Sequence, residues 1–388
     1  MNSSWHRAAP LQAALGALIC LAFGSSSAVS AEAPSRKDVL TLAAKVADWQ
    51  LARLDGLHIT SHMKEESREK RSWQQGAFWV GMTHFADVSP NKRFRAAILE
   101  MGRANGWKPG DRVLHADDHV IAQPYLWAAS RKWVGAEAFA PLRRNFDAIL
   151  ANPPVVHLSF YFSKNYGEAQ CLDRWCWCDA IFMSPPAWLE LTNLTGERKY
   201  RDFALSEFWA ATDFLYDPAE KLYFRDSRFF ERRDEQGRKL FWSRGNGWVF
   251  AGIANMLDLL PEDHADRTRL EALFKEMAGR LEQLQKPDGY WAPSLLGPEN
   301  SPPETSGTGF FVYGLAWGVN RGLLDANQYR DSIHRGWTAL TRAVAKDGRL
   351  GYVQQVSDRP EQVAESDTQF YGVGALLLAA SEVSKLQE

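Results

Sequence analysis

The sequence predicts an all-α protein, an (α/α)6 barrel built from six helical hairpins. Apolar residues recur at helical spacing from Ser35 onward, for example over residues 39–54, and no long alternating strand pattern follows. Six apolar helix starts can be aligned, and from Asp118 onward they recur at intervals of roughly 60 to 66 residues. About 60 residues is room for two helices and their connections. An irregular array of helices is the alternative.

Each of the six starts is a short apolar run with a glycine or a carboxylate beside it. They lie at residues 75–79, 117–121, 179–183, 245–249, 307–311 and 371–375. If each one opens the inner helix of a hairpin, hairpins joined head to tail can close into a ring. The segments that precede the inner helices then meet at one shared mouth, where glycines permit close backbone approach.

Length, charge and composition narrow the class of protein. The chain has 388 residues, a formal net charge of −2 and a pI near 6.5, so it lacks the basic bias of proteins that bind nucleic acid or anionic membranes. Its 16 tryptophans fit a packed core, and they equally fit a site that stacks on sugar faces. A closed barrel can hold residues 32–388 as one domain.

The N-terminus has the three-part pattern of a secretory signal. Residues 1–9 carry Arg7 and no acid, residues 11–23 form an apolar run, and residues 24–31 are rich in small side chains. The apolar run is too short to span a bilayer comfortably. We therefore expect a signal peptide over residues 1–31, cleaved after Ala31, and an exported protein that is periplasmic or secreted.

Three cysteines, Cys171, Cys176 and Cys178, remain after the signal. An exported protein can form a disulfide, and the odd number leaves one thiol over, so the pairing stays open. The spacing contains no paired C-x-x-C and no nearby fourth ligand, which favours a buried thiol or a local disulfide over zinc. A nucleophilic cysteine is disfavoured, because no histidine lies in the same stretch to lower its pKa.

The clearest chemistry lies in residues 171–183, which lead through two tryptophans to Asp179. A carboxylate beside Trp175 and Trp177 has few waters to solvate its charge, so its pKa should rise. A raised pKa suits a proton donor that works near neutral pH. The alternative is that Asp179 caps the following helix, although Pro185 and Pro186 favour a later helix start.

The run WSRGNGW at residues 242–248 places an arginine between two indoles. The Arg244 guanidinium can bind a planar carboxylate through two parallel hydrogen bonds, and Trp242 and Trp248 can stack on a sugar ring. These residues predict a site for an acidic sugar. A structural turn, with the arginine over aromatic faces, is the alternative.

The segment HADDH at residues 115–119 offers two acids and two histidines at one helix start. Asp118 or Asp117, with His115 beside them, can assist Asp179 or hold substrate hydroxyls. Helix capping is the alternative. Metal binding is disfavoured, because five consecutive residues at a helix start splay their side chains. We expect no metal and no organic cofactor.

Four segments together resemble the unsaturated rhamnogalacturonyl hydrolases of glycoside hydrolase family 105, which are related to the family 88 unsaturated glucuronyl hydrolases. They are HADD at 115–118, WCD at 177–179, WSRGNGW at 242–248 and PETSGTGF at 303–310. The resemblance extends from about residue 39 to residue 383. It implies an (α/α)6 barrel, in agreement with the six helix starts.

The resemblance also implies the reaction. Enzymes of this family act on lyase products whose terminal uronic acid carries a C4=C5 double bond. They protonate C4 and add water at C5, and the resulting hemiketal opens and expels the rest of the sugar. One carboxyl group that gives a proton and then activates water suffices. By motif match Asp179 is this acid/base and Asp118 the assisting carboxylate, although the choice between Asp117 and Asp118 stays open.

A substrate-binding set follows from the same match. The residues expected around the unsaturated uronate are Trp177, Trp242, Arg244, Trp248, Asp117 and His115. This chain has Arg225 in a segment where many relatives carry a histidine, and we expect Arg225 to replace that histidine near the substrate carboxylate.

We therefore expect a hydrolase of unsaturated uronyl oligosaccharides from pectin, specifically Δ4,5-galacturonyl-rhamnose. The oligosaccharide is the expected partner, without nucleic acid or membrane, and the protein is expected to be a monomer or a weak homo-oligomer. Two alternatives stay open. One is a conventional inverting glycosidase on the same barrel, and the other is a non-catalytic protein that binds acidic sugars.

Overall fold

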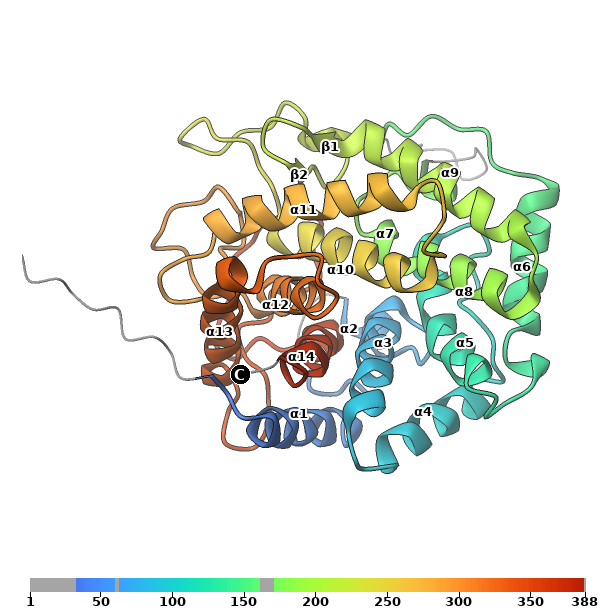
Figure 1. Ribbon diagram of the computed structural model, residues 1–388, viewed down its shortest axis with the longest axis horizontal. Helices are drawn as coiled ribbons and strands as arrows, with labels where there is room; N and C mark the ends of the chain where they lie inside the picture. The colour runs from blue at the N-terminus through green and yellow to red at the C-terminus, as the bar shows by residue number, and fades with distance from the viewer. Residues whose placement is uncertain (1–32, 60–62, 161–170, 387–388) are drawn as a thin grey trace, which may run out of the picture. The chain divides into compact units, whose positions relative to one another are not determined.

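The computed structural model describes residues 33–59, 63–160 and 171–386, and its helices form an (α/α)6 barrel (Figure 1). The residues from Ala31 onward belong to one compact unit. The expected signal peptide, residues 1–31, lies outside the described residues. Within the described ranges, no helix is long and apolar enough to span a bilayer.

The inner ring contains, within the part described, six helical segments taken alternately along the chain. They are α3 (Trp73–Val88), α5 (Gln123–Ser130), α8 (Pro185–Thr195), α10 (Ser243–Leu259), α12 (Thr305–Asn320) and α14 (Phe370–Val383). Each packs against the next, and α14 packs against α3, which closes the ring. The 3-10 helix η1 (Ala116–Ala122) leads into α5, and the short helix α7 (Ala180–Met183) leads into α8. The six predicted starts all open inner segments, so the predicted barrel is confirmed.

The outer helices lie around this ring in Figure 1. They are α1 (Arg36–Leu51), α4 (Arg93–Ala104), α6 (Ala140–Ala151), α9 (Arg198–Leu215), α11 (Arg267–Gln283) and α13 (Ala326–Arg342). The connections contain α2 (Lys64–Arg68), η2 (Ala136–Ala138), η3 (Cys171–Asp173) and η4 (Ser227–Phe229). Strands β1 (Tyr216–Asp217) and β2 (Leu222–Tyr223) form a short antiparallel hairpin.

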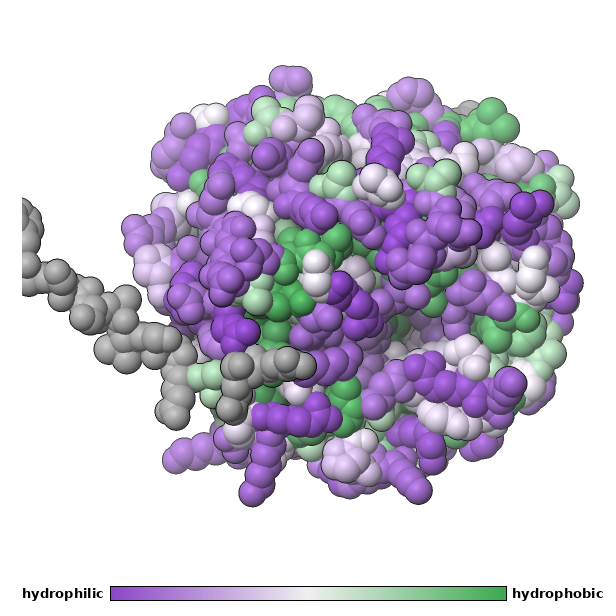
Figure 2. Space-filling model, in the orientation of Figure 1, coloured by the Kyte–Doolittle hydropathy of each residue, from purple (hydrophilic) through white to green (hydrophobic). Residues whose placement is uncertain are grey.

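Residue patterning separates the two layers. Every residue of α14 is buried, and apart from Ser381 and Glu382 near its end the sequence is apolar all round, which is typical of a helix enclosed by protein. The outer helix α13 instead buries Ile333, Trp337 and Leu340 on one face and carries charged residues on the other. On the face shown in Figure 2, hydrophilic residues cover most of the surface, with hydrophobic residues gathered nearer its middle.

Glycines bring the first and last inner helices together. A methyl group added at Gly81 in α3 would lie 2.3 Å from the carbonyl oxygen of Gly374 in α14, and one added at Gly374 would lie 2.4 Å from that of Ala77. Backbones this close leave no room for a side chain. Substitution at either glycine would therefore push apart the two helices that close the ring.

Candidate active site

The amino-terminal ends of the inner helices meet at one end of the barrel. Arg244 in the first turn of α10 reaches Ser306 in α12, with 3.4 Å between Nη1 and Oγ. The ring of Trp73 at the start of α3 stacks on Tyr371 of α14, with centroids 5.3 Å apart. The segments that precede the inner helices therefore share one region, as the aligned starts predict.

Asp179 and Arg225 are brought together by a backbone hydrogen bond between their segments. The Cys178 amide donates to the Arg225 carbonyl over 2.9 Å, which ties the exit of β2 to the start of α7. As a result, Arg225 Nε lies 3.6 Å from Oδ2 of Asp179. The two side chains keep exposed fractions of only 14% and 13%, so both are largely enclosed by protein.

The environment of Asp179 favours its protonated form. Burial raises the pKa of Asp179 above its ordinary value, and Arg225, the Cys178 thiol and Arg244 oppose that rise in part. In the described structure, its side chain caps no helix amide, although the residue directly precedes α7. The structure thus fits a proton donor and not the helix cap considered as the alternative.

Asp117 is a second carboxyl group with a raised pKa. Burial raises the pKa of Asp117 to about 7; Arg112 opposes this, and the negative charge of Asp179 adds to it. The Asp117 side chain is 17% exposed, and its Oδ2 lies 3.8 Å from Nδ1 of His115. Burial holds the pKa of His115 well below its ordinary value, so this imidazole is neutral beside the carboxyl group.

Asp118 occupies a different environment from its neighbour. Its carboxylate accepts from the Arg112 guanidinium at 2.6 and 2.9 Å and from the Arg112 amide at 2.6 Å. The guanidinium donates to Oδ1 and the amide donates to Oδ2, so both carboxylate oxygens of Asp118 already have fixed partners. The structure therefore places the motif-matched Asp118 in an ion pair, and it places Asp117 within electrostatic reach of Asp179.

Arg244 is enclosed by aromatic rings and carbonyl groups. Its guanidinium lies over Trp242 and Tyr371, 4.4 and 4.6 Å from the ring centroids, and donates to the carbonyls of Gln354 and Gln355 at 2.7 and 2.9 Å. The residue has no exposed surface. Arg244 therefore organises the segment before α14, whereas Arg225 keeps an exposed fraction of 14% in its side chain.

The three tryptophans expected to hold the sugar lie below the surface. Trp248 is fully buried and packs on Phe182 and Phe310, with centroids 4.8 and 4.4 Å away, so it belongs to the core. Trp242 and Trp177 are each 2% exposed. Trp177 packs on the His115 ring at 5.0 Å, and thus supports the site from behind.

Trp73 lies at the same end of the barrel, and sequence reasoning did not single it out. Its partly exposed ring stacks on Tyr371, whose own ring supports Arg244. The sequence did contain a clue to this residue. Trp73 lies two residues before the helix start at residue 75, as Trp177 lies two residues before the start at residue 179. Trp73 is partly exposed, whereas Trp177, Trp242 and Trp248 are buried.

The three cysteines of the described residues divide into a pair and a single thiol. Cys171 and Cys176 form a disulfide in the loop before Asp179, and Cys178 is the free, buried cysteine of the described residues. Among those same residues there is no group of three or more His, Cys, Asp or Glu side chains that could hold a metal ion.

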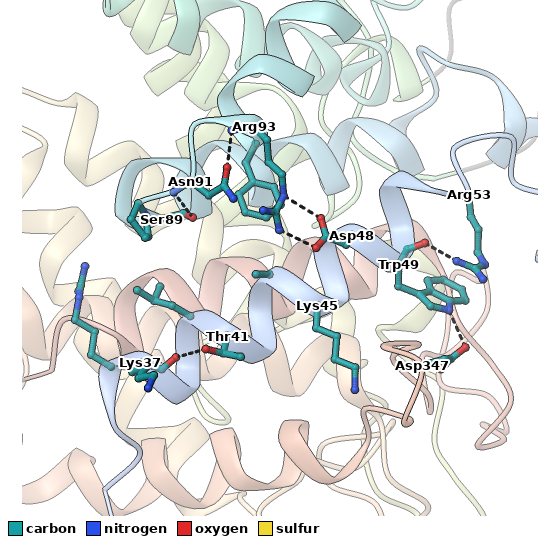
Figure 3. Close-up of a pocket in the computed structure, with 15 residues that line it drawn as sticks. Lys37, Thr41, Lys45, Asp48, Trp49, Arg53, Ser89, Asn91, Arg93 and Asp347 are labelled. Atoms are coloured by element: carbon teal, nitrogen blue, oxygen red, sulfur yellow. Dashed lines mark hydrogen bonds and ion pairs between the residues drawn. The ribbon is translucent and has the colours of Figure 1, made fainter.

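A separate groove of about 1020 Å³ lies between α1, the connection from α3 to α4, and Asp347. Figure 3 shows its ion pair between Asp48 and Arg93, 2.8 Å apart, and the 2.9 Å hydrogen bond from Trp49 to Asp347. None of the residues predicted for the active site lines this groove. Its paired charges fasten α1 to its neighbours.

An (α/α)6 barrel with two buried, protonatable carboxyl groups beside an arginine is compatible with a glycoside hydrolase. The chain belongs to Glycosyl Hydrolase Family 88, whose sequence profile matches residues 42–387. The resemblance stated from the sequence, to family 105 and the related family 88, is confirmed by this family match, and a solved family 88 structure is similar to this chain.

Two curated relatives cover most of the chain. The unsaturated 3S-rhamnoglycuronyl hydrolase of Alteromonas sp. (strain LOR) is 43% identical over 345 residues, which is 87% of this chain and 83% of the relative. A protein of the same name from Formosa agariphila is 37% identical over 324 residues, covering 81% and 85%.

Solved structures agree on the fold. A glycosyl hydrolase family 88 protein from Bacteroides vulgatus has a TM-score of 0.78 and 26% identity, covering 91% of this chain and 99% of its own. A possible family 105 member from Salmonella enterica has a TM-score of 0.71 at 17% identity, covering 91% and 95%. The second likeness concerns the fold alone.

Proposed function

We propose that this glycoside hydrolase removes a terminal unsaturated uronate from oligosaccharides by hydrating its C4=C5 double bond, with Asp179 as the proton donor. The observation that carries the proposal is the position of Asp179: buried, raised in pKa, and 3.6 Å from Arg225 Nε. The two curated relatives are named for unsaturated rhamnoglycuronyl hydrolysis, which supports the same reaction here.

Asp179 acts first as an acid and then as a base. Its proton goes to C4 as the π electrons of the double bond form the new C–H bond, and positive charge develops at C5 beside the ring oxygen. The ionised carboxylate then takes a proton from the water whose oxygen bonds to C5. The resulting hemiketal opens and releases the rest of the oligosaccharide.

Asp117 is the second carboxyl group of this site. Because the charge of Asp179 raises the pKa of Asp117, the two groups resist being ionised together. Asp117 keeps an accessible tip that can hold a substrate hydroxyl or the water, while Asp118 is engaged by Arg112. This assignment replaces the choice of Asp118 that the sequence register favoured.

Arg225 binds the uronate carboxylate. Its Nη1 is held by Asp226 over 2.8 Å, and its buried Nε has no hydrogen-bond acceptor among the described residues. The side chain keeps an exposed fraction of 14%, and a positively charged guanidinium in a partly buried site favours a bound anion. Trp73 lies at the same end of the barrel and supplies the aromatic face for the sugar ring.

The sugar that follows the uronate is rhamnose in this proposal. The sequence alone suggested a pectin-derived galacturonyl-rhamnose, whereas the names of the relatives point to the 3S-rhamnoglycuronyl class. We therefore place sulfated rhamnose oligosaccharides, such as lyase products of ulvan, ahead of rhamnogalacturonan products as the substrate.

The test uses lyase digests of ulvan, of chemically desulfated ulvan, of rhamnogalacturonan and of a glycosaminoglycan. The expected result is loss of the ultraviolet absorbance of the double bond, fastest with the sulfated digest, and abolished in Asp179→Asn while the unfolding transition is retained. Turnover of saturated substrates would instead identify a conventional glycosidase. Binding of every digest without turnover would identify a sugar-binding protein.

We also propose that the protein is exported. The pattern of residues 1–31 and the Cys171–Cys176 disulfide both support an oxidising compartment outside the cytoplasm. N-terminal sequencing of the protein from the periplasm or the medium should begin at Glu32. Recovery from the cytoplasm with Met1 in place would reject export.

A further inference from the structure

Cys178 carries a buried thiol to which the reaction above gives no role. It has no exposed surface and stands outside the disulfide of its neighbours Cys171 and Cys176. Its Sγ lies 3.4 Å from Oδ2 of Asp179, within hydrogen-bond distance for sulfur. Arg225 Nε approaches the same oxygen at 3.6 Å.

We propose that Cys178 is a positioning residue whose thiol, together with Arg225, holds Oδ2 of Asp179, so that the opposite oxygen, Oδ1, carries the proton to the substrate. This role rests on the proposed function of Asp179. It assigns the two oxygens of one carboxyl group to two different tasks, one anchored by the protein and one offered to the reacting carbon.

Packing against α10 restricts the Cys178 side chain to a position beside Asp179. A methyl group added at Gly245 would lie 3.1 Å from Sγ and 2.9 Å from the Trp242 ring, so α10 closes the space on that side. The Cys178 backbone is fixed as well, because its amide donates to the Arg225 carbonyl over 2.9 Å. The sulfur therefore has little freedom to turn away from the carboxyl group.

The protonation state of the thiol suits a donor. Burial raises the pKa of Cys178 well above its ordinary value, and the charge of Asp179 adds to this, so the sulfur keeps its hydrogen at neutral pH. A neutral thiol donates to an ionised carboxylate and stabilises that form. It acts in the same direction as the positive charge of Arg225.

The balance between burial, which raises the pKa of Asp179, and the thiol and guanidinium, which lower it, matters for the reaction. One carboxyl group must release a proton and then accept one. Burial alone would leave Asp179 a reluctant donor, since the ionised product would be poorly solvated. A thiol and a guanidinium on Oδ2 supply that solvation from fixed protein groups, and they leave Oδ1 facing the substrate. An apolar side chain at position 178 would fill the same space, but it would neither solvate the ionised carboxylate nor hold Oδ2 in place.

The decisive variants are Cys178→Ala, which removes the donor, and Cys178→Ser, which replaces it with a stronger one. Without the donor the carboxylate is less stable, so the alkaline limb of the kcat/KM profile should move to higher pH by about one unit in Cys178→Ala. In Cys178→Ser the limb should stay or move to lower pH. A purely structural thiol would lower the melting temperature in Cys178→Ala and leave both limbs where they are, which would overturn the proposal.

A measurement without substrate gives an independent readout. The infrared S–H stretching band that disappears in Cys178→Ala should lie at the lower frequency of a hydrogen-bonded thiol, and it should shift in Asp179→Asn. If the band keeps the same frequency in Asp179→Asn, the hydrogen bond from Cys178 to Asp179 is rejected. These results separate the two proposals, because loss of the proposed function appears as an inactive wild-type protein, whatever the infrared band does.

Discussion

Nε of Arg225 lies 3.6 Å from Oδ2 of Asp179, and within the described structure that nitrogen has no hydrogen-bond acceptor. Asp226, which is fully buried, holds Nη1 of the same guanidinium at 2.8 Å and so fixes its plane. The positive charge of Arg225 therefore lowers the pKa of the acid, and its partly exposed side chain is the proposed partner of the uronate carboxylate. In this proposal the same arginine connects substrate binding to proton transfer.

Removing that arginine should weaken binding and alter the pH profile together. Arg225→Gln should raise KM by about 10- to 100-fold, because the substrate carboxylate loses a charged donor. It should also move the alkaline limb of kcat/KM to higher pH, since the opposite charge that lowers the pKa of Asp179 is gone. Steady-state kinetics across pH on the unsaturated digest measure both changes.

Arg244→Lys is the matched control for that variant. Because Arg244 donates to two carbonyls that would lose a partner, the free energy of unfolding should fall by about 1–3 kcal/mol. KM should rise less than in Arg225→Gln. If the lysine variant were the one with the larger KM, Arg244 and not Arg225 would be the substrate-binding arginine.

The two adjacent aspartates should respond differently to the same change. Asp117→Asn should lower kcat by about 100-fold with the fold retained, because a carboxyl group beside Asp179 is lost. Asp118→Asn should retain most of kcat and lose about 1–3 kcal/mol of stability, because it breaks the pair with Arg112. Kinetics and urea unfolding of both variants settle the assignment, and the reverse pattern would restore Asp118.

Asp117 should also leave a signature in the pH dependence of stability. Its pKa is raised to about 7 in the folded protein, from an ordinary value of 3.8. Between those values the folded state binds the extra proton, so the stability that Asp117 contributes is complete below about pH 4 and is lost as pH rises through 7. Each pKa unit corresponds to roughly 1.4 kcal/mol.

The difference in unfolding free energy between wild type and Asp117→Asn isolates this contribution, measured by urea unfolding from pH 4 to 9. It should fall with rising pH and level off above 7. The comparison is needed because buried histidines act in the opposite direction; burial lowers the pKa of His119 to about 4, for example. A difference independent of pH would contradict the raised pKa.

Trp73 and Trp248 should separate sugar binding from core packing. Trp73→Ala should raise KM by about 3- to 10-fold, because a partly exposed aromatic face is lost. Trp248→Ala should lower the free energy of unfolding by about 3–5 kcal/mol, because the ring is fully buried. Substrate titration and chemical denaturation measure the two effects, and an unchanged KM in Trp73→Ala would remove that residue from the site.

The Cys171–Cys176 disulfide should steady the loop that leads to Asp179. It joins cysteines five positions apart, and for so short a loop its loss should cost about 2 kcal/mol of stability. The double variant Cys171→Ala/Cys176→Ala should therefore unfold at lower denaturant concentration and show a lower kcat. Reductant should reproduce both effects in wild type and add nothing in the double variant. Equal stability with and without reductant would argue against the bond.

The sequence was enough for the architecture and for the buried position of Asp179, the proposed acid. Helical spacing and recurring starts are local patterns, so they predict the inner helices, and the apolar surroundings of Asp179 follow from its neighbours in the chain. The family match at residues 177–179 and 242–248 led to the same class of enzyme that the comparisons show.

The tertiary structure alone decided which of the two adjacent aspartates remains unpaired by Arg112 and within electrostatic reach of Asp179. Asp117 and Asp118 are adjacent in the chain, yet the second turns to Arg112 because residues 110–112 fold back onto it. Arg244 and Trp248 belong to a clear motif, and both are buried by rings from α7, α12 and α14. The free thiol at Cys178 became evident only when its two neighbours paired. The burial of Arg244 and Trp248 depends on contacts between segments far apart in sequence, and the Arg112–Asp118 and Cys171–Cys176 pairs depend on how a loop folds back on itself. Patterns of helical spacing carry no information about either kind of contact.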